Sequence, residues 1–473
     1  MKYIEAMVDE QIKKWEQEHH GGWNPTPEGC GPASKPVIAI TPRFGCGSRV
    51  VSDLLHRRTG YEIYGFKLID KVAESMHARR RLIDCLDQRD RSYILNLVDG
   101  ALSGRHVDRA DYIRGLMEVV SVFVQEGGCI LLGRGAPFLV PQDAGIRVLL
   151  TASPKTRIKN LMEFYSISAE EAETRMVQSD LEREEFSKMY YGKDPWDPAH
   201  YDMAINMDRI TPETAAGSIL QALERLRCEK KAHRLHAMEG DVINLVNRQV
   251  EKWERETHHE RVAMWGEAPD ETAPPNAQHA PVVAFSPQFC SGSRYVADEL
   301  HTRLGYEIFG YKIIDKVAED MHLSPRIIDH LDHRARSAIQ TFIDRFVSQQ
   351  PVNPHQYFIS LAKMIRALVM RGGVILIGRG STFLVEEGEG LRIRMIASME
   401  RRLENMKTFY KIEGKPAEEN LLKGDKQRAE FIEQYYHTNV DDICQFDMVF
   451  NMDRLMPCAV ADAVRRALEP LMF

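Results

Sequence analysis

The sequence predicts an α/β fold with two tandem parallel-sheet domains, each preceded by an amphipathic helix, and three observations predict it. First, the segment 60–76 recurs at 305–321 with thirteen of seventeen positions identical. Second, the offset of 245 residues holds over a long stretch, from 47–202 in the first copy to 292–447 in the second. Third, short apolar strands alternate with helical patterns in each copy, which is typical of a parallel sheet covered by helices on both faces.

Each copy is expected to contain five strands, because five short runs are rich in Val, Ile and Leu. In the first copy they fall at 37–41, 61–64, 129–133, 146–151 and 202–206, and in the second copy 245 residues later. A helix is expected before the third strand, since Leu116, Val119, Val120 and Phe123 follow helical spacing. Ligands of parallel sheets bind beyond the carboxyl ends of the strands, so the turns after the first, third and fourth strands should converge on one cleft.

Six segments make up the expected domain organisation. These are an N-terminal amphipathic helix (1–22), a linker (23–36), a first domain (37–230), a second amphipathic helix (238–260), a linker (261–280) and a second, more degenerate domain (281–473). Each helix either packs on its own domain or reaches the sister copy or a protein partner, and the Pro-rich linkers permit both.

The length, charge and composition of the chain argue against several classes of protein. A chain of 473 residues is too long for one ordinary core. A net charge of −7 argues against a nucleic-acid partner, and no apolar run approaches the roughly 18 residues that a membrane span needs. The acidic N-terminus does not resemble a signal peptide, and the eight cysteines form no C-x-x-C pair that would indicate a zinc site. A cytoplasmic protein is expected.

The first strand runs into a turn with two glycines, Gly45 and Gly47, and a helical pattern follows. Backbone N–H groups and a helix N-terminus meet in such a turn, and both favour phosphate. A tight turn also needs glycine for steric reasons alone, and the full Walker pattern with its lysine is not met. Cys46 lies in this turn, where a helix N-terminus favours a thiolate; the alternative is a small residue that the turn tolerates.

Four arginine positions recur in both copies. They are Arg49, Arg134, Arg157 and Arg183 in the first copy and Arg294, Arg379, Arg402 and Arg428 in the second. Arg134 and Arg379 stand between two glycines, so that a guanidinium there can bind two phosphate oxygens at once. Asp180 precedes Arg183 by three residues on a helical pattern; this spacing is also that of an ordinary surface salt bridge.

An ordered set of motifs resembles the cytidylate kinase-like family. The motifs are Phe-Gly-x-Gly-x-Arg, Gly-Tyr-x-Ile-Tyr, Gly-Arg-Gly, Ala-Ser-Pro-x-x-Arg, the Asp-x-x-Arg segment from 180 to 198, and Tyr-Asp-x-x-Ile-Asn-x-Asp-Arg. The resemblance covers most of 37–226 and, more loosely, 281–470. It implies two P-loop NTPase-like domains similar to bacterial cytidylate kinases, with ATP and Mg²⁺ as cofactors.

The resemblance also implies roles for individual residues. The implied phosphate-binding residues are Gly45, Cys46, Gly47, Ser48 and Arg49 in the first copy and Gly292, Ser293 and Arg294 in the second, with Ser48 also touching magnesium. The implied acceptor-binding residues are Arg134, Arg379 and Tyr191. The implied catalytic residues are Arg49, Arg134, Arg157, Asp180 and Arg183. Such a site suits phosphoryl transfer, which depends on positioning and charge neutralisation.

Departures from the family pattern distinguish the two copies. Ser48 and Ser293 stand where true cytidylate kinases have the Walker lysine, and the next residue on a helix points about 100° away. The family pattern has an acidic residue just after the second strand. This position is occupied by Gly65 in the first copy and by Gly310 in the second. The second copy also has Cys290 in place of the first glycine and lacks the tryptophan motif around Trp196. The first copy is therefore the better candidate for an active domain.

The leading functional expectation is transfer of the ATP γ-phosphoryl group to a nucleoside monophosphate such as CMP. One alternative is a catalytically weak nucleotide sensor or scaffold, favoured by the missing lysine and the extra helices. Another is a kinase for a different small metabolite, because the acceptor contacts depart most from the family. The repeat also predicts an intramolecular pseudo-dimer and leaves homo-oligomers open.

Overall fold

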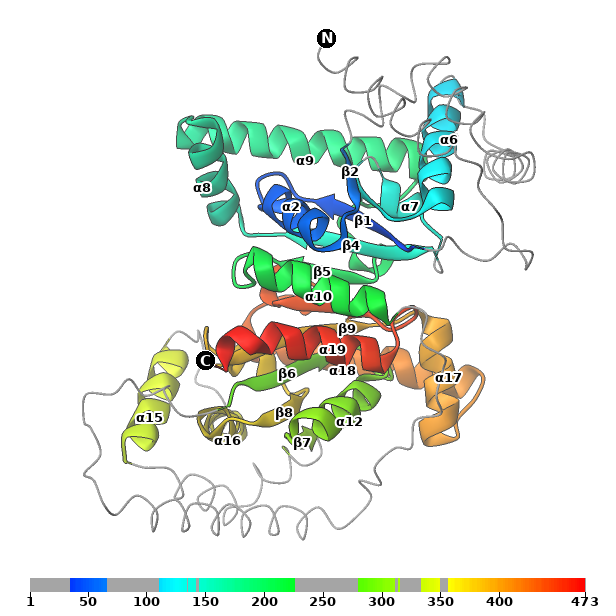
Figure 1. Cartoon of the computed structure of the whole chain (residues 1–473). Helices are drawn as coiled ribbons and strands as arrows, with labels where there is room; N and C mark the ends of the chain where they lie inside the picture. Colours follow the sequence, from blue (N-terminus) through cyan, green and yellow to red (C-terminus); the bar gives the residue numbers. More distant parts are fainter. Residues whose placement is uncertain are drawn as a thin grey trace. The chain divides into compact units, whose positions relative to one another are not determined.

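The computed structural model describes residues 35–65, 110–133, 135–141, 144–225, 280–310, 314, 333–348 and 356–472. The chain divides into two compact units, Met1–Cys228 and Glu229–Phe473. Both expected amphipathic helices, nearly all of both linkers, and Arg134 lie outside the described residues. The predicted α/β class with two parallel-sheet domains is confirmed, and it is consistent with two P-loop-like domains (Figure 1).

The first unit contains a five-stranded parallel sheet in the order β2-β3-β1-β4-β5. The strands are β1 (Val37–Pro42), β2 (Glu62–Gly65), β3 (Cys129–Leu132), β4 (Gly145–Thr151) and β5 (Met203–Asn206). Each boundary agrees within one residue with the prediction. Because β1 pairs with both β3 and β4, the turns after these three strands lie at one edge of the sheet, as expected.

Helices cover this sheet. They are α2 (Ser48–Thr59), α6 (Ala110–Glu126), α7 (Ala136–Leu139), α8 (Pro154–Tyr165), α9 (Ala169–Tyr191), the 3₁₀ turn η1 (Pro198–His200) and α10 (Pro212–Glu224). The side chains of Ser153 and Ser168 cap α8 and α9 by accepting backbone N–H bonds, and Pro154 begins α8, where its missing N–H costs nothing. Helix α2 instead has Gly47 as its N-cap residue, so no side chain caps its N-terminus.

The second unit repeats this arrangement in the order β7-β8-β6-β9-β10. Its strands are β6 (Val282–Pro287), β7 (Glu307–Gly310), β8 (Val374–Ile377), β9 (Gly390–Ile396) and β10 (Met448–Asn451). Its helices are α12 (Ser293–Leu304), α15 (His333–Ser348), α16 (Gln356–Arg371), η2 (Ser381–Leu384), α17 (Met399–Tyr410), α18 (Lys415–Tyr436), η3 (Ile443–Gln445), α19 (Pro457–Leu468) and η4 (Glu469–Leu471).

Each unit has a core of its own. In the first, β1 and β3 pack on the apolar face of α6, with Leu116, Val120 and Phe123 buried. In the second, the equivalent strands pack on α16 around Phe358. Among the described helices, none is long and apolar enough to cross a membrane.

Candidate functional site

The turn between β1 and α2 has the backbone that its glycines predict. Gly45 and Gly47 adopt φ values of +86° and +87°, a region that side chains with a Cβ rarely enter. A Cβ on Gly45 would also lie 2.8 Å from the carbonyl oxygen of Arg157 on α8. The turn is therefore pressed against α8, and the first glycine is required for space as well as for conformation.

Polar side chains of α8 and α9 hold the carbonyl groups of this turn. Arg157 donates from Nε to the Phe44 carbonyl at 2.7 Å, and Asn160 donates to the Gly45 carbonyl at 2.8 Å. Arg183 donates to the carbonyl of Pro42. Helices α8 and α9, called the lid helices below by analogy with the family, are thus fixed to the glycine turn and the end of β1 by hydrogen bonds from Arg157, Asn160 and Arg183.

Asp180 joins these cations. Its Oδ2 lies 2.6 Å from Arg157 Nη2 and 3.7 Å from Arg43 Nη1. The Arg43 guanidinium in turn lies 4.5 Å from the centre of the Trp196 ring. Only 2% of Arg157 is exposed, and the Asp180 side chain is 18% exposed, so the two form a largely buried ion pair between α8 and α9.

Two of the residues expected to bind phosphate have other surroundings. Arg49 is the second residue of α2; it is exposed, and its guanidinium lies 5.4 Å from the centre of the Phe164 ring.

Cys46 is 1% exposed, and burial raises the pKa of its thiol to about 11 despite hydrogen bonding from Ser48. A thiolate is therefore not favoured there, because the loss of solvation exceeds the effect of the helix N-terminus.

The Gly-Arg-Gly turn is packed against a tyrosine in each domain. A Cβ on Gly135 would lie 2.1 Å from the Tyr191 ring, and one on Gly380 would lie 2.2 Å from the Tyr436 ring. The Tyr436 hydroxyl donates to the carbonyl of Arg379 at 3.2 Å. The glycine after each arginine thus makes room for the tyrosine, and Tyr191, an implied acceptor-binding residue, lies beside this turn.

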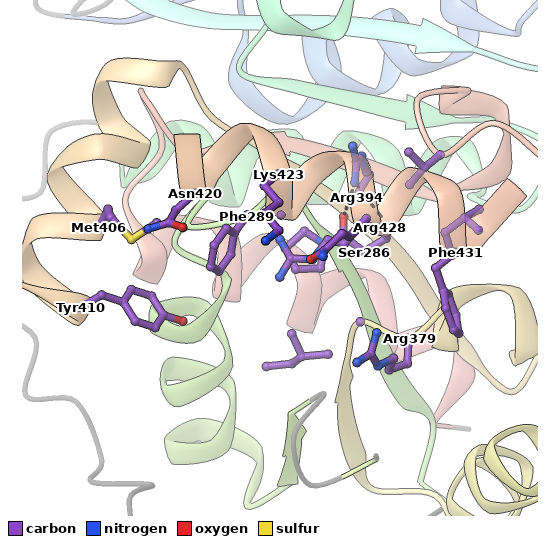
Figure 2. A pocket seen from close by; sticks show the side chains of 18 of the residues that line it. Ser286, Phe289, Arg379, Arg394, Met406, Tyr410, Asn420, Lys423, Arg428 and Phe431 are labelled. Carbon is purple, nitrogen blue, oxygen red and sulfur yellow. Dashed lines mark hydrogen bonds between the residues drawn. The ribbon is translucent and has the colours of Figure 1, made fainter. Parts of the chain in front are cut away.

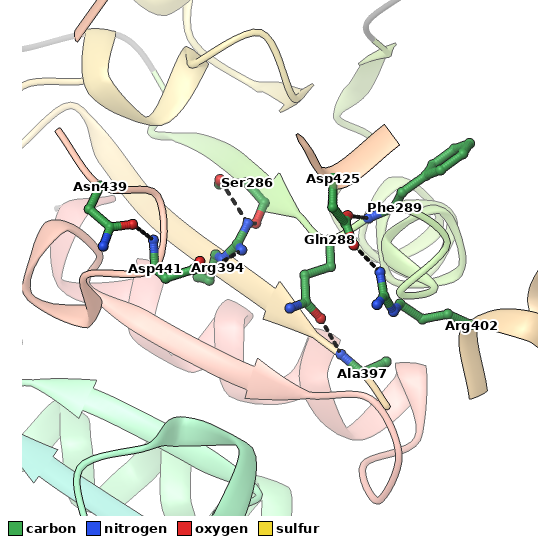
Figure 3. A network of polar contacts seen from close by, with 9 residues as sticks. All are labelled: Ser286, Gln288, Phe289, Arg394, Ala397, Arg402, Asp425, Asn439 and Asp441. Atoms are coloured by element: carbon green, nitrogen blue, oxygen red, sulfur yellow. Dashed lines mark hydrogen bonds and ion pairs between the residues drawn. The ribbon is translucent and has the colours of Figure 1, made fainter. Parts of the chain in front are cut away.

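The second domain keeps the connection between its lid and its turn but changes the donors (Figure 3). Asp425 forms an ion pair with Arg402 and accepts from the backbone N–H of Phe289 at 2.8 Å. Asn405 donates to the Cys290 carbonyl at 2.8 Å, as Asn160 does to Gly45. The position of Gly45 is held here by Cys290 at a φ of +61°.

Sequence reasoning missed a carboxylate that positions α8. Asp208, after β5, accepts from the backbone N–H and the hydroxyl of Ser153, each at about 3 Å. Asp453 does the same for Ser398 in the second domain. The signal was present, since the Ala-Ser and Asn-x-Asp-Arg motifs recur together, but only the structure shows that they touch.

The second domain also has a cavity of about 500 Å³ at the carboxyl ends of β6, β8 and β9, beneath α17 and α18 (Figure 2). It contains Arg379 and Arg428, two of the four repeated arginines. A third lining arginine, Arg394 on β9, was not expected from the repeat, because the first domain has Leu149 at that position. Among the described residues, no group of His, Cys, Asp and Glu side chains is arranged to hold a metal ion by itself.

A family model identifies the group of proteins to which this chain belongs. The model of the cytidylate kinase-like family matches residues 37–209 and 282–454. The chain belongs to this family. Both cytidylate kinase-like regions include the glycine turn, the lid arginines and the Asn-x-Asp-Arg motif, and the tandem duplication is thereby established.

Two further comparisons add little. No curated protein matches the chain. A crystal structure of an uncharacterized protein from Eubacterium ventriosum ATCC 27560 matches at 18% identity and a TM-score of 0.31, covering 40% of this chain and 99% of its own. At this TM-score the match carries no argument about function.

Proposed function

We propose that the chain is a nucleotide kinase-like phosphotransferase that moves the γ-phosphoryl group of ATP to a nucleoside monophosphate resembling CMP, with the first domain as the active copy. One observation carries the proposal. A glycine turn at the carboxyl end of the central strand β1 is held by Arg157, Asn160 and Arg183 of the lid helices. Cations and backbone donors therefore meet where an anion would bind.

The residues of the turn fit a nucleotide phosphate. Helix α2 has no side-chain cap, and a bound phosphate would accept from N–H groups at this N-terminus. Gly45, Gly47 and Ser48 would hold the donor phosphates, and Ser48 would hold magnesium. ATP would supply the phosphoryl group and Mg²⁺ would neutralise its charge, while Arg157 and Arg183 would bind the transferred group in place of the turn carbonyls.

The proposal is tested with purified protein, ATP and Mg²⁺ against CMP, dCMP, UMP, AMP and GMP, with diphosphate formation followed directly. Turnover of one monophosphate is expected. Arg183→Ala should reduce kcat on the order of 100-fold, as loss of a transition-state donor does. The matched control is Arg175→Ala, because Arg175 is an exposed arginine on the same helix that pairs with Glu171 and lies 5.6 Å from the centre of the Tyr165 ring. Equal losses in the two variants would contradict the assigned role.

A second candidate function is a nucleotide sensor with little or no transfer activity. It is favoured because Arg157 and Arg183 already donate hydrogen bonds to backbone carbonyl groups. It is also favoured because Ser48 stands at the position of the Walker lysine. Nucleotide binding by calorimetry without turnover of any of the five monophosphates would support this candidate over the kinase.

A further inference from the structure

The cavity of the second domain is strongly cationic. Four basic residues line it: Arg379, Arg394, Lys423 and Arg428. None of the described residues that line it is acidic. A volume of about 500 Å³ is within the range of small-molecule sites, and such an excess of positive charge in a concave site favours an anion.

Aromatic rings hold two of these cations and supply the apolar wall. The Arg428 guanidinium lies 4.7 Å from the centre of the Phe289 ring, and that of Arg379 lies 5.4 Å from the Phe431 ring. Tyr410 lines the cavity at the end of α17 (Figure 2). A ligand that combines a phosphate with a ring would satisfy both kinds of surface.

Arg394 is the buried member of the cationic group. Its side chain is 7% exposed; Nη1 donates to the Ser286 carbonyl at 3.2 Å and Nη2 lies 2.8 Å from Asp441 Oδ1 (Figure 3). A guanidinium withdrawn from water requires an anion as a neighbour, and burial accordingly lowers its pKa. Asp441 supplies that anion here.

The counter-ion itself is not buried. The Asp441 side chain is 69% exposed, and it belongs to the loop between α18 and η3. Moving this carboxylate fully into water would cost it little, whereas Arg394 would need a replacement anion. The pair is thus asymmetric: the cation is fixed in the sheet and its partner is exchangeable.

Comparison of the two domains shows that only the second can form this pair. The first domain has Leu149 at the position of Arg394 and Trp196 at the position of Asp441, at the constant offset of 245 residues. Leu149 is fully buried in β4, so the strand itself does not require a charge there. A buried charge that the fold does not need is most simply explained by a ligand.

We propose that the cavity of the second domain binds a phosphomonoester, that Arg394 determines its specificity for the phosphate, and that the Asp441 carboxylate takes the place of that phosphate until the ligand binds. Binding exchanges one charge-assisted contact of Arg394 for another, and Asp441 moves into solvent. No covalent step is involved. Arg379 already places this cavity at the acceptor site that the family resemblance implies; the new inference is the exchange between Asp441 and the ligand at Arg394, and it does not depend on phosphoryl transfer.

The test is calorimetric titration of the full chain, without ATP, with inorganic phosphate and separately with CMP. In Arg394→Leu, which carries the residue of the first domain, we expect the affinity of one binding site to fall at least tenfold. In Asp441→Asn, which removes the competing carboxylate, we expect the same site to bind several-fold more tightly. Arg394-dependent binding of inorganic phosphate would identify a free anion as a sufficient ligand, and Arg394-dependent binding of CMP alone would identify the nucleotide; both support the proposal.

Arg401→Ala is the matched control, because Arg401 is a half-exposed arginine of α17 that pairs with Glu404 and does not line the cavity. Its isotherms should equal those of the unmodified chain. If Arg394→Leu fails to fold, Asp441→Asn decides, since Asp441 is exposed. Unchanged binding in Arg394→Leu, weaker binding in Asp441→Asn, or no binding of either anion overturns the proposal. Because turnover is not measured, failure of the kinase proposal leaves this result unaffected.

Discussion

Gly45 and Gly47 share a left-handed backbone but differ in their surroundings. A Cβ on Gly45 would lie within 3.0 Å of Arg157 and Leu161 atoms on α8, whereas a Cβ on Gly47 would meet nothing within 4 Å. Conformational strain is therefore common to both positions, and steric conflict belongs to Gly45 alone. The two glycines of the Phe-Gly-x-Gly motif therefore differ in what an alanine would cost: backbone strain at both positions, and steric conflict at Gly45 in addition.

Gly45→Ala should consequently destabilise the first domain more than Gly47→Ala. Left-handed strain costs roughly 1–2 kcal/mol in each variant, and overpacking adds about 1–3 kcal/mol at Gly45. Hydrogen exchange of peptides from 35–65 and 144–165 would measure the difference. Equal protection in the two variants would show that α8 moves away from the turn without cost.

Cys46 provides a prediction about reactivity and pH. Burial raises the pKa of its thiol from the ordinary 9.0 to about 11, so the thiol is neutral at pH 8. Alkylation of Cys46 in the folded protein should therefore be slow at pH 8, and fast after unfolding, as read by mass spectrometry. The raised pKa favours the folded state below pH 9, and this contribution is lost as the pH rises from 9 to 11. Rapid alkylation of the folded protein would contradict the burial of this thiol.

Helix α8 carries both Arg157 and Asn160, so its position determines how the turn is held. Its N-terminus is fixed twice, by the Ser153 cap and by the Asp208 carboxylate that accepts from Ser153. Asp208 follows β5 and therefore connects the carboxyl end of this strand to α8. Helix α17 has the same anchor in Asp453.

Asp208→Ala should destabilise the first domain by about 1.5–3 kcal/mol, the usual cost of losing hydrogen bonds to a charged group. Asp453→Ala is the matched variant in the second domain, and its effect should be smaller because the bonds to Asp453 are exposed. Denaturant unfolding of each variant checks the order. A larger loss in Asp453→Ala would show that exposure does not decide the value of this anchor.

The strands and helices could be predicted from the sequence because their residue patterns are local and occur in both copies. The ten strands of the described residues follow from apolar runs between turn residues, and α6 follows from the spacing of Leu116, Val120 and Phe123. Contacts between elements could not be predicted. The packing of Tyr191 on Gly135, and the pair of Arg394 with Asp441, depend on the register of segments 47 to 56 residues apart in the chain.

Across the whole molecule, the two domains share some contacts and differ in others. Both domains retain the ion pair between the first lid helix and the second, as Arg157 with Asp180 and as Arg402 with Asp425. Only the first has the contact between Arg43 and Trp196. The ion pair between the two helices is thus repeated, while the contact between Arg43 and Trp196 is not.

Divergence predicts unequal effects of equivalent substitutions. If the first domain is the active copy, Arg134→Ala should abolish phosphotransfer, with a loss on the order of 100-fold or more, and Arg379→Ala should have a much smaller effect. Steady-state kinetics on the best monophosphate would measure both. Similar losses would mean that the two domains contribute equally, and the asymmetry inferred from Trp196 would be wrong.

The glycine turn also limits how the two halves of the gene can exchange sequence. Recombination between such repeats would occasionally copy the second turn into the first, with Cys290 replacing Gly45. A Cβ at that site would meet the Arg157 carbonyl at 2.8 Å, so the hybrid would be selected against. Copying in the other direction brings in a glycine, which adopts the φ of +61° at Cys290 without strain. Exchange between the repeats should therefore be one-directional at this position, from the first domain to the second.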